Sequence, residues 1–427
     1  MRTLLLGSGG REHALAWALS RSDTVGELFA LPGNPGIGEL CELLSGKAED
    51  PSEVLAAVQR LGVELVVVGP EAPLVAGVAD SLRQEGVAVF GPDAKAARLE
   101  GSKSFAKQVM DSAGVPTGEW ERCDEVGDAI AALDRFGPPY VVKADGLAAG
   151  KGVAVTADRD QAIEAVRDRL ERGVFGAAGS SVVIEEHLDG PEASLICFSD
   201  GEHVLPCEPA QDFKRALDDD AGPNTGGMGA YSPVPDCPPG VADGVVEEIL
   251  QPMVRTLATM GCPFVGALYA GLALTAKGPK VVEFNARFGD PETQALIPRL
   301  TSDFGEVCLA SATGELEGLK LDWTPDACVV VVIASGGYPG DHQTGFPIDG
   351  IEEAIAHGAL VFHAGTALDN GRVVTAGGRV LTVAALDTSI AGARARAYAA
   401  AGEIRFEGRH MRSDIAARAE AVERRAL

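Results

Sequence analysis

The chain has 427 residues, enough for two to four domains, and 46% of them are hydrophobic, which is ordinary for a globular protein. Its 62 acidic and 36 basic residues give a formal net charge of −26, which disfavours nucleic acid as a partner because phosphate backbones recruit basic surfaces. The longest apolar run, CVVVVIA at 328–334, is far too short to span a bilayer, and the opening MRTLLLGSGG is unlike a secretory leader. We therefore expect a cytoplasmic protein with no membrane partner, whose eight cysteines are reduced and mostly structural.

Residues 1–100 alternate short β-branched strands with helices. We expect strands at RTLLLG, ELFALPG, VELVVVG and VAVFG, and helices over REHALAWALS, near 51–61 and near 72–85. This alternation predicts a parallel, doubly wound sheet. Ligands of such sheets bind at the carboxyl ends of the strands, which here carry the turns GSGGREH, PGNPG and GPEAPL.

The first of these turns invites a dinucleotide interpretation, which two features disfavour. The turn lacks the G-x-G-x-x-G spacing, and the second strand ends in ALPGN, without the acidic residue that would hold a ribose. The backbone amides of Gly9, Gly10 and Arg11 still stand at a helix start and can seat a phosphate. A plain tight turn is the alternative.

From about 101 to 326 the pattern mixes helices with antiparallel-looking strands. Residues 138–158 predict two strands joined by a small-residue loop, a helix follows over 158–172, and 181–198 predicts a hairpin. Within VKADGLAAGKGV, Lys143 ends a strand and Lys151 lies in the glycine loop, so that two ammonium groups and free amides can meet a polyphosphate. The spacing is not that of a Walker A loop, and a surface hairpin with lysines is the alternative.

Two further segments carry polar groups in unusual positions. The long irregular stretch 210–233 combines Asp212, Lys214 and Arg215 with glycines, and such a loop inside a compact domain is usually functional or disordered. VVIEEHLDGPEAS leads a strand into carboxylates that can hold ribose hydroxyls, although acidic hairpins are common. From 326 onward, short strands run to a terminal helix and predict a further domain.

The segment VVEFNARFGDPETQ at 281–294 predicts a strand with one polar face. Because side chains alternate, Glu283, Asn285 and, if the strand continues, Arg287 share a face, while Val282 and Phe284 point the other way. Carboxylate and amide oxygens suit a hard cation such as Mg²⁺, with phosphates and water completing its shell. An internal salt-bridge network is the alternative.

Taken together, these segments resemble the ATP-grasp superfamily and, within it, the family of phosphoribosylamine-glycine ligase, also called glycinamide ribonucleotide synthetase. The resemblance rests on segments in family order: GSGGREHALAW, PGNPG, VGPEAPLVAGVAD, LEGSKSFAK, VVKADGLAAGKGV, VIEEHLDGPEAS, GPNTGGMGAYSP, EFNARFGDPETQ, ASGGYPGD and FHAGT. It covers essentially the whole chain, and RFGDPETQ is its most specific part.

The resemblance implies a multidomain fold of α/β and α+β type. An N-terminal Rossmann-like parallel sheet would occupy 1–100, an ATP-grasp domain 101–326 with a small lid subdomain near 115–190, and a C-terminal mixed β domain 327–427. The implied reaction joins glycine to 5-phosphoribosylamine through glycyl phosphate, with ATP as co-substrate and Mg²⁺ or Mn²⁺ as cofactor. We expect these small molecules as the only partners, and a monomer.

The resemblance also implies roles for individual residues. Catalytic roles fall to Arg287, Lys214 and Asp212, and the metal ligands are Glu283 and Asn285. The implied ATP-binding residues are Lys103, Lys143, Gly150, Lys151, Gly152, Glu185, Glu186, His187, Leu188 and Glu192. The implied substrate-binding residues are Gly9, Gly10, Arg11, Glu12, Asn34, Gly69, Pro70, Glu71, Asn224, Thr225, Gly226, Gly227 and Met228.

The chain departs from the family pattern at two places. Phe213 stands where relatives often carry histidine or tyrosine, so a polar contact from that side chain would be lost. The region VGALYAGLALT before the Glu-x-Asn pair holds no second acidic metal ligand, so only two protein ligands are assigned.

Three other functions are disfavoured by the sequence. Another carboxylate–amine ligase or a carboxylase of the same fold is disfavoured by RFGDPETQ. A non-catalytic nucleotide-binding regulator should have lost a lysine, the Glu/Asn pair or Arg287, and none is missing. A nicotinamide oxidoreductase is disfavoured by the first turn.

Overall fold

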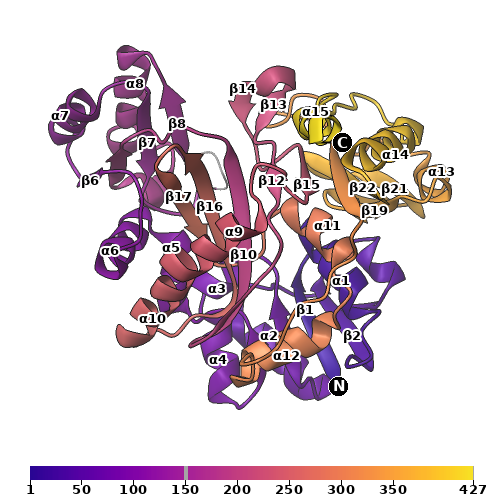
Figure 1. Ribbon diagram of the computed structural model, residues 1–427. Coiled ribbons are helices and arrows are strands. Elements are labelled where there is room, and N and C mark those ends of the chain that lie inside the picture. The colour runs from indigo at the N-terminus through magenta and orange to yellow at the C-terminus, as the bar shows by residue number, and fades with distance from the viewer. Residues whose placement is uncertain (149–151, 427) are drawn as a thin grey trace.

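The computed structural model describes residues 1–148 and 152–426 (Figure 1). Its first sheet is parallel throughout, in the order β3-β2-β1-β4-β5, and confirms the Rossmann-like fold predicted for the N-terminal part. The strand β3 is only two residues long and was not predicted. The bounds are β1 (Arg2–Gly7), β2 (Glu27–Pro32), β3 (Glu42–Leu43), β4 (Leu65–Val68) and β5 (Ala88–Phe90).

Six helices connect or follow these strands. The helix predicted near 72–85 is two helices, because Gly77 takes a left-handed conformation (φ 82°) that interrupts the first and begins the second. The bounds are α1 (Gly10–Leu19), α2 (Pro51–Leu61), α3 (Glu71–Val75), α4 (Val78–Gln84), α5 (Ala94–Gly101) and α6 (Lys103–Ala113).

A small antiparallel sheet forms a separate lobe with α7 and α8 (Figure 1). Its strand order is β6-β9-β7-β8, and its core, which includes Leu133, Val142 and Ile184, is separate from the other cores. The two strands and the helix predicted over 138–172 are confirmed here. The bounds are β6 (Trp120–Cys123), α7 (Val126–Phe136), β7 (Tyr140–Ala144), β8 (Val153–Thr156), α8 (Arg159–Leu170) and β9 (Val182–Glu185).

The central sheet is antiparallel, in the order β11-β10-β16-β17. The hairpin predicted over 181–198 is wrong, because β9 pairs with β6 and β7 while β10 pairs with β11 and β16. Residues 186–191 therefore cross from the small sheet to the central sheet. The bounds are β10 (Glu192–Asp200), β11 (Val204–Pro206), β16 (Val265–Thr275), β17 (Gly278–Asn285), α9 (Pro239–Val245), α10 (Gln251–Thr259), α11 (Glu292–Leu296) and α12 (Phe304–Thr313).

The C-terminal sheet has the order β12-β15-β18-β22-β19, and all its pairs are antiparallel. Two of its strands, β12 and β15, come from the stretch 211–232, far from the others in sequence. The bounds are β12 (Gln211–Asp212), β13 (Arg215–Leu217), β14 (Ala221–Asn224), β15 (Gly229–Ser232), β18 (Ala327–Ala334), α13 (Ile351–Ala356), β19 (Leu360–His363), β20 (Thr366–Asp369), β21 (Arg372–Thr375), β22 (Arg379–Asp387), α14 (Ile390–Glu403) and α15 (Ala417–Ala426).

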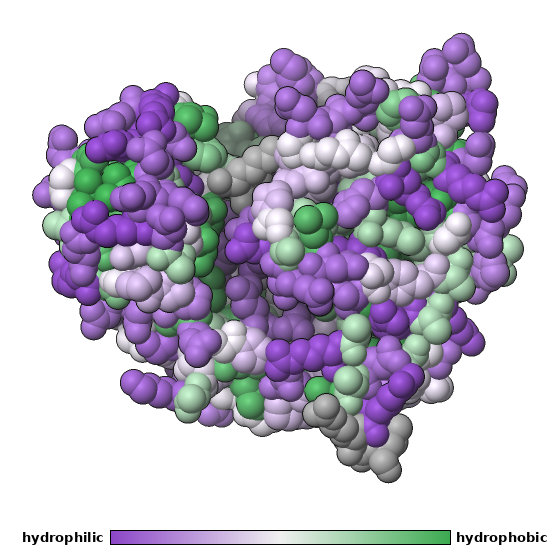
Figure 2. All heavy atoms as spheres, turned by 90° about the horizontal axis from the view of Figure 1, so that it is seen from above, coloured by the Kyte–Doolittle hydropathy of each residue, from purple (hydrophilic) through white to green (hydrophobic). Residues whose placement is uncertain are grey.

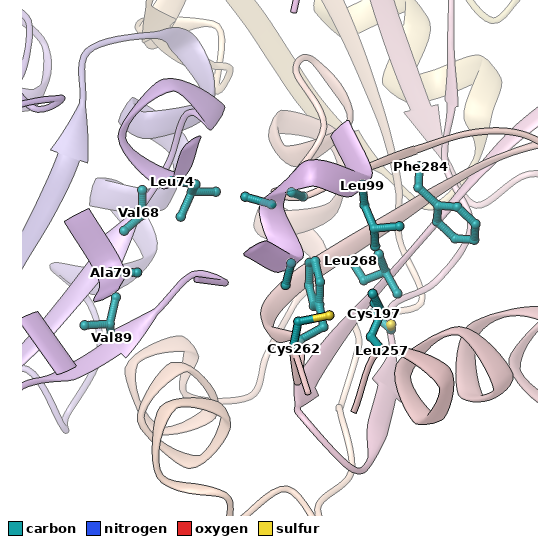
Figure 3. Close-up of a cluster of buried hydrophobic side chains, with 14 of the residues drawn as sticks. Val68, Leu74, Ala79, Val89, Leu99, Cys197, Leu257, Cys262, Leu268 and Phe284 are labelled. Carbon is teal, nitrogen blue, oxygen red and sulfur yellow. The ribbon is translucent and has the colours of Figure 1, made fainter. Parts of the chain in front are cut away.

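One hydrophobic core joins the first sheet to the central sheet. Figure 3 shows part of it, with Val68 and Leu74 on one side and Leu268 and Phe284 on the other. Each large apolar side chain buried in such a core contributes roughly 1.5–3 kcal/mol, so this junction is strongly fixed. No helix among the described residues has both the length and the apolar character that crossing a membrane requires.

Candidate active site

A cavity of about 1400 Å³ lies where the small, central and C-terminal sheets meet. Seen from above, the molecule is hollowed between the lobe of the small sheet and the rest, and hydrophilic residues line much of this hollow (Figure 2). The crossing segment 186–191, the end of β17 and the stretch 211–226 all contribute to the cavity wall. Segments far apart in sequence thus converge on one site.

Most of the predicted site residues line this cavity. They are Arg11, Glu71, Lys103, Lys143, Gly152, Glu185, Glu186, His187, Leu188, Glu192, Asp212, Lys214, Asn224, Thr225, Gly226, Glu283, Asn285 and Arg287. The structure does not bring the others to its wall: Gly9, Gly10, Glu12, Asn34, Gly69, Pro70, Gly227 and Met228. Gly150 and Lys151 lie outside the described residues.

The strand β17 presents Glu283 and Asn285 to the cavity, but not by simple alternation. A register shift between Gly271 and Leu272 of β16 makes Val282 an extra residue in β17. Consequently Val281 is buried with Phe284, while Val282 lines the cavity, so the prediction that Val282 shares the apolar face of Phe284 is wrong.

Glu283 lies between two lysines from different segments. Its Oε2 is 3.6 Å from Nζ of Lys103, and its Oε1 is 4.0 Å from Nζ of Lys214. Burial acts to raise the pKa of Glu283, but Lys103, Lys214 and other cations outweigh it and hold this pKa at about 2. The carboxylate is therefore ionised at neutral pH.

An ionised Glu283 beside Asn285 fits a hard divalent cation, because both side chains offer oxygen donors. Across residues 1–148 and 152–426, no group of three or more His, Cys, Asp or Glu side chains is arranged to hold a metal. A cation bound at this pair would therefore need most of its ligands from phosphates and water, as Mg²⁺ commonly does.

Arg287 lies beyond the end of β17 and is held by two carboxylates. Its Nη2 donates to Oε1 of Glu100 at 2.6 Å, and its Nε donates to Oε2 of Glu71 at 3.1 Å. Although burial opposes ionisation, Arg287 and Arg11 lower the pKa of Glu71 to about 2. An internal ion-pair network, the alternative function of this segment, is therefore present at the cavity wall. Glu100 was missed, although it lies in the segment LEGSKSFAK.

A second buried network holds Lys143. Lys143 and Lys107 both form ion pairs with Glu185. Nζ of Lys107 lies 2.5 Å from Oε2 of Glu185, and all three side chains are about 95% buried. Lys143 also donates to the carbonyl of Val282 at 2.9 Å. Burial acts to raise the pKa of Glu185, but the two lysines lower it. Lys107 was missed, although it lies one helical turn after Lys103 on α6.

Acidic and basic groups also alternate around Lys214 on the cavity wall. Nζ of Lys214 lies 2.7 Å from Oε2 of Glu192, and the hydroxyl of Ser194 donates to Oε1 of Glu292 at 2.9 Å. Burial raises the pKa of Asp212 to about 8, against the opposing effect of Lys214 and with a further contribution from neighbouring carboxylates including Glu292. This part of the cavity wall can bind a cationic amine beside an anionic group. Glu292 was missed as a site residue.

Phe213 of the departing segment QDFKR packs against a cation. Cζ of Arg412 lies 5.0 Å from the centroid of the Phe213 ring, which is within the range of cation–π attraction. Arg412 also donates to Asp414 and to Oδ1 of Asp220 at 2.9 Å, so it ties the β13–β14 hairpin to the C-terminal segment.

The first turn is engaged within the protein. The amide of Gly9 donates to Oε2 of Glu12 at 2.6 Å, and Nε of Arg11 donates to Oε1 of the same carboxylate at 2.5 Å. A Cβ on Gly10 would lie 2.8 Å from Nε2 of Gln294, so the turn packs closely against the segment after β17. Of this turn, Arg11 alone reaches the cavity wall described above.

Two buried histidines, His13 and His363, join this turn to the C-terminal sheet. The amide of His363 donates to Nδ1 of His13 at 2.8 Å, and Nδ2 of Asn34 donates to the carbonyls of Ser8 and His363, both at 2.8 Å. Burial lowers the pKa of His13 to about 3, with a further contribution from His363, and burial lowers the pKa of His363 to about 4. Both imidazoles are therefore neutral in the folded protein at neutral pH.

Comparisons with known proteins identify the family. The models of the phosphoribosylglycinamide synthetase N domain, ATP-grasp (A) domain and C domain match residues 1–100, 101–293 and 328–418. A phosphoribosylamine–glycine ligase of Streptomyces coelicolor is 53% identical, over 98% of this chain and 99% of the relative. One of Agrobacterium fabrum is 48% identical, over 99% of this chain and the whole relative.

Solved structures agree with this assignment. The crystal structure of phosphoribosylamine–glycine ligase from Thermotoga maritima superposes with a TM-score of 0.86 at 33% identity, covering 97% of this chain and all of that one. The biotin carboxylase domain of Hydrogenobacter thermophilus 2-oxoglutarate carboxylase has a TM-score of 0.72 at 15% identity, covering 96% and 91% of the two chains, and shares the fold alone. The chain belongs to the phosphoribosylglycinamide synthetase family of ATP-grasp ligases.

Proposed function

We propose that the protein ligates glycine to 5-phosphoribosylamine using ATP, and so forms N1-(5-phosphoribosyl)glycinamide, ADP and phosphate in purine synthesis. The observation that carries this proposal is that two carboxyl groups, Asp212 and Glu292, line the same cavity as the cations Lys214 and Arg287, which we assign to its amino-acid end. Opposite charges side by side complement an amino acid, which carries both an ammonium and a carboxylate. The bicarbonate of a carboxylase has no ammonium to meet those two acids.

The nucleotide would occupy the opposite end. Lys103 and Lys143 would contact its phosphates. Residues 185–188, at the end of β9 and the start of the crossing segment, would bind the adenine, with Glu192 near the ribose. Leu147 and Val155 give this end an apolar wall from the small sheet. The small sheet, near 115–190, would act as a lid that excludes water from reactive intermediates.

Glu283 and Asn285 would hold Mg²⁺ or Mn²⁺ between the two ends. When bound, the ion would neutralise charge on the transferring phosphoryl group. Lys103 and Lys214, which lie 3.6 and 4.0 Å from the carboxylate of Glu283, would add positive charge from either side. Phosphoryl transfer depends mainly on such positioning and electrostatic stabilisation.

The reaction would proceed in two steps. A carboxylate oxygen of glycine attacks the γ-phosphorus of ATP. The bond between this phosphorus and the oxygen bridging it to the β-phosphate breaks, so that ADP leaves and glycyl phosphate forms. The amine of phosphoribosylamine then attacks the acyl carbon, phosphate departs, and the amine loses a proton. Arg287 would hold the reacting anionic group, while Asp212 and Glu292 would hold the ammonium of glycine away from the reacting carbon.

One assay tests this function. The protein is incubated with ATP, Mg²⁺, glycine and phosphoribosylamine formed in place from ribose 5-phosphate and ammonia, and ADP and the glycinamide product are measured. We expect both products only when every component is present. ADP formed equally well without glycine would contradict the proposal, and ADP that depends on bicarbonate instead would indicate a carboxylase.

A further inference from the structure

The loop that closes the amino-acid end of the cavity is suspended from the C-terminal sheet. It starts after β12, where Asp212 pairs with Ala230, and it ends at β15, which pairs with β18. Its residues Asn224, Thr225 and Gly226 line the cavity. Backbone hydrogen bonds hold both ends of this loop, and the amides of Thr225 and Met228 also donate to the carbonyls of Lys214 and Phe213, whereas the backbone groups of Gly226 are bonded to side chains.

Arg379, the first residue of β22, supplies the first of these contacts. Its Nη1 donates to the carbonyl of Gly226 at 2.5 Å and to the carbonyl of Asp290 at 2.8 Å, and its Nη2 donates to Oδ2 of Asp290 at 2.9 Å. A Cβ on Gly226 would lie 3.0 Å from Cζ of Arg379, so the guanidinium packs directly on the loop backbone. One side chain thus joins two segments that are far apart in sequence.

Tyr338 supplies the second contact, also from the C-terminal part. Its hydroxyl accepts a hydrogen bond from the amide of Gly226 at 3.0 Å. Its ring packs against Gly378, where an added Cβ would lie 2.3 Å from the ring. Both backbone groups of Gly226, the amide and the carbonyl, are therefore bonded to side chains of the C-terminal part of the chain.

The Asp290 turn connects this arrangement to the chemistry. Asp290 lies between Arg287 and Glu292, both on the cavity wall, and its Oδ1 accepts from Nε2 of Gln294 at 2.8 Å. Gly227 (φ 109°) lies directly against this turn, since an added Cβ would be 2.4 Å from Cδ of Pro291. The contacts between the loop and the turn therefore determine how Asn224, Thr225 and Gly226 lie relative to Arg287 and Glu292.

We propose that Arg379 is a positioning residue for the amino-acid end of the site. By bonding to Gly226 and to Asp290 together, it holds the loop 224–227 against the turn that carries Arg287 and Glu292. The reaction in which it acts is the ligation proposed above. We expect its effect to fall on glycine rather than on ATP, because the two segments that it joins, at Gly226 and Asp290, belong to the end of the cavity assigned above to the amino acid.

The test compares Arg379→Met with the wild type in steady-state kinetics. We expect kcat/KM for glycine to fall by roughly 10–100-fold, since a misplacement of about 1 Å at a reacting centre costs on that order. The KM for ATP should change by less than about threefold. Arg379→Lys, which keeps the charge but loses the two-pronged geometry, should recover part of the loss. An unchanged glycine KM and kcat, or an equal effect on ATP and glycine, would overturn the proposal.

Two further variants separate positioning from a general effect on folding. Tyr338→Phe removes only the hydroxyl that accepts from Gly226, and we expect a smaller change in the same direction. Arg372→Met is the matched control, because Arg372 lies in the same part of the chain but is exposed and forms an ion pair with the exposed Asp349. The control should leave all constants unchanged.

A measurement without activity keeps this proposal distinct from the proposed function. Hydrogen exchange over 221–228 should be faster in Arg379→Met and Tyr338→Phe than in the wild type, and unchanged in Arg372→Met. Equal exchange in all four proteins would overturn the positioning role even if the ligation assay succeeds. A wild type that fails the ligation assay but shows the expected exchange pattern would overturn the proposed function and support the positioning of the loop.

Discussion

The two ends of the cavity balance their charges in different ways. At the end assigned to the nucleotide, Lys107 and Lys143 enclose one carboxylate, Glu185, and Lys103 adds a further cation. At the amino-acid end, one cation, Arg287, is enclosed by the carboxylates of Glu71 and Glu100. In a chain of net charge −26, the excess of lysines at the nucleotide end gives a local positive charge that can attract phosphates. At the amino-acid end, the two carboxylates hold the guanidinium of Arg287 at the cavity wall, where a substrate anion could replace them.

The comparison predicts that the lysine network matters most for stability. Lys107→Met should remove one of the two cations that pair with the buried carboxylate of Glu185 and leave Lys143 as its partner, at a cost of about 1–3 kcal/mol in the free energy of unfolding. Urea denaturation measures this loss. The exposed Lys320 gives the control, because Lys320→Met should change stability by less than about 0.5 kcal/mol. A Lys107→Met protein as stable as the control would show that the two ends do not differ in this way.

At the other end, the largest effect should be on turnover. Arg287→Ala should lower kcat by about 10²–10³, the scale for removing one partner of the developing charge. Steady-state kinetics with saturating ATP and glycine measure it, and Arg287→Lys should retain more activity than Arg287→Ala. Normal turnover in Arg287→Ala would mean that Arg287 serves only its ion pairs with Glu71 and Glu100.

The two buried histidines, His13 and His363, should make the stability of the protein depend on pH. His13 and His363 have lowered pKa values in the folded protein, about 3 and about 4, so the unfolded chain binds more protons below pH 6.5. Their contribution is complete above pH 6.5 and falls as the pH falls towards 4, by about 2 kcal/mol per histidine between pH 7 and pH 5.

Urea denaturation at pH 7 and pH 5 measures this contribution. His13→Gln should be less stable at pH 7 but should lose less stability than the wild type on going to pH 5. The exposed His357 provides the control, since His357→Gln should keep the wild-type dependence. Parallel pH curves for the wild type and His13→Gln would contradict the prediction.

The smallest effect should come from the titration of Asp212. Its pKa of about 8 means that the side chain is largely protonated at pH 7 and ionised above pH 8. An ionised carboxylate holds an ammonium more strongly, so kcat/KM for glycine should rise up to about tenfold between pH 7 and pH 8.5. Asp212→Asn should flatten that rise. A profile for Asp212→Asn that matches the wild type would remove Asp212 from the glycine end.

Local patterns in the sequence predicted the fold well where partners are near in the chain. The parallel sheet of 1–100 could be predicted because its strands and helices alternate along the chain, and the structure confirms it. The hairpin at 181–198 failed because a six-residue connection suits a turn and a crossing between sheets equally well. The assignment of β12 and β15 to the C-terminal sheet could not be predicted, since β18 lies about a hundred residues further on.

The candidate site shows the same division. Lys103, Lys214, Glu283 and Asn285 stand in recognisable segments and do meet at one cavity. Arg379 carries no such signal, because its role comes from a partner, Asp290, that is 89 residues away in the chain. The turns at Gly9 and Asn34 have the residue types of a ligand site, yet their polar groups are bonded within the protein. Their predicted role in substrate binding stays a prediction.

The ring of Phe213 covers the guanidinium of Arg412, whose Cζ lies 5.0 Å from the ring centroid. What this position offers the guanidinium is an electron-rich aromatic face, and phenylalanine, tyrosine and histidine can each present one. The polar atom that the family resemblance leads us to expect at this position is not needed for that contact. Exchanges among aromatic residues should be nearly neutral in evolution, whereas leucine at this position would leave the neighbouring cation without its flat, polarisable cover.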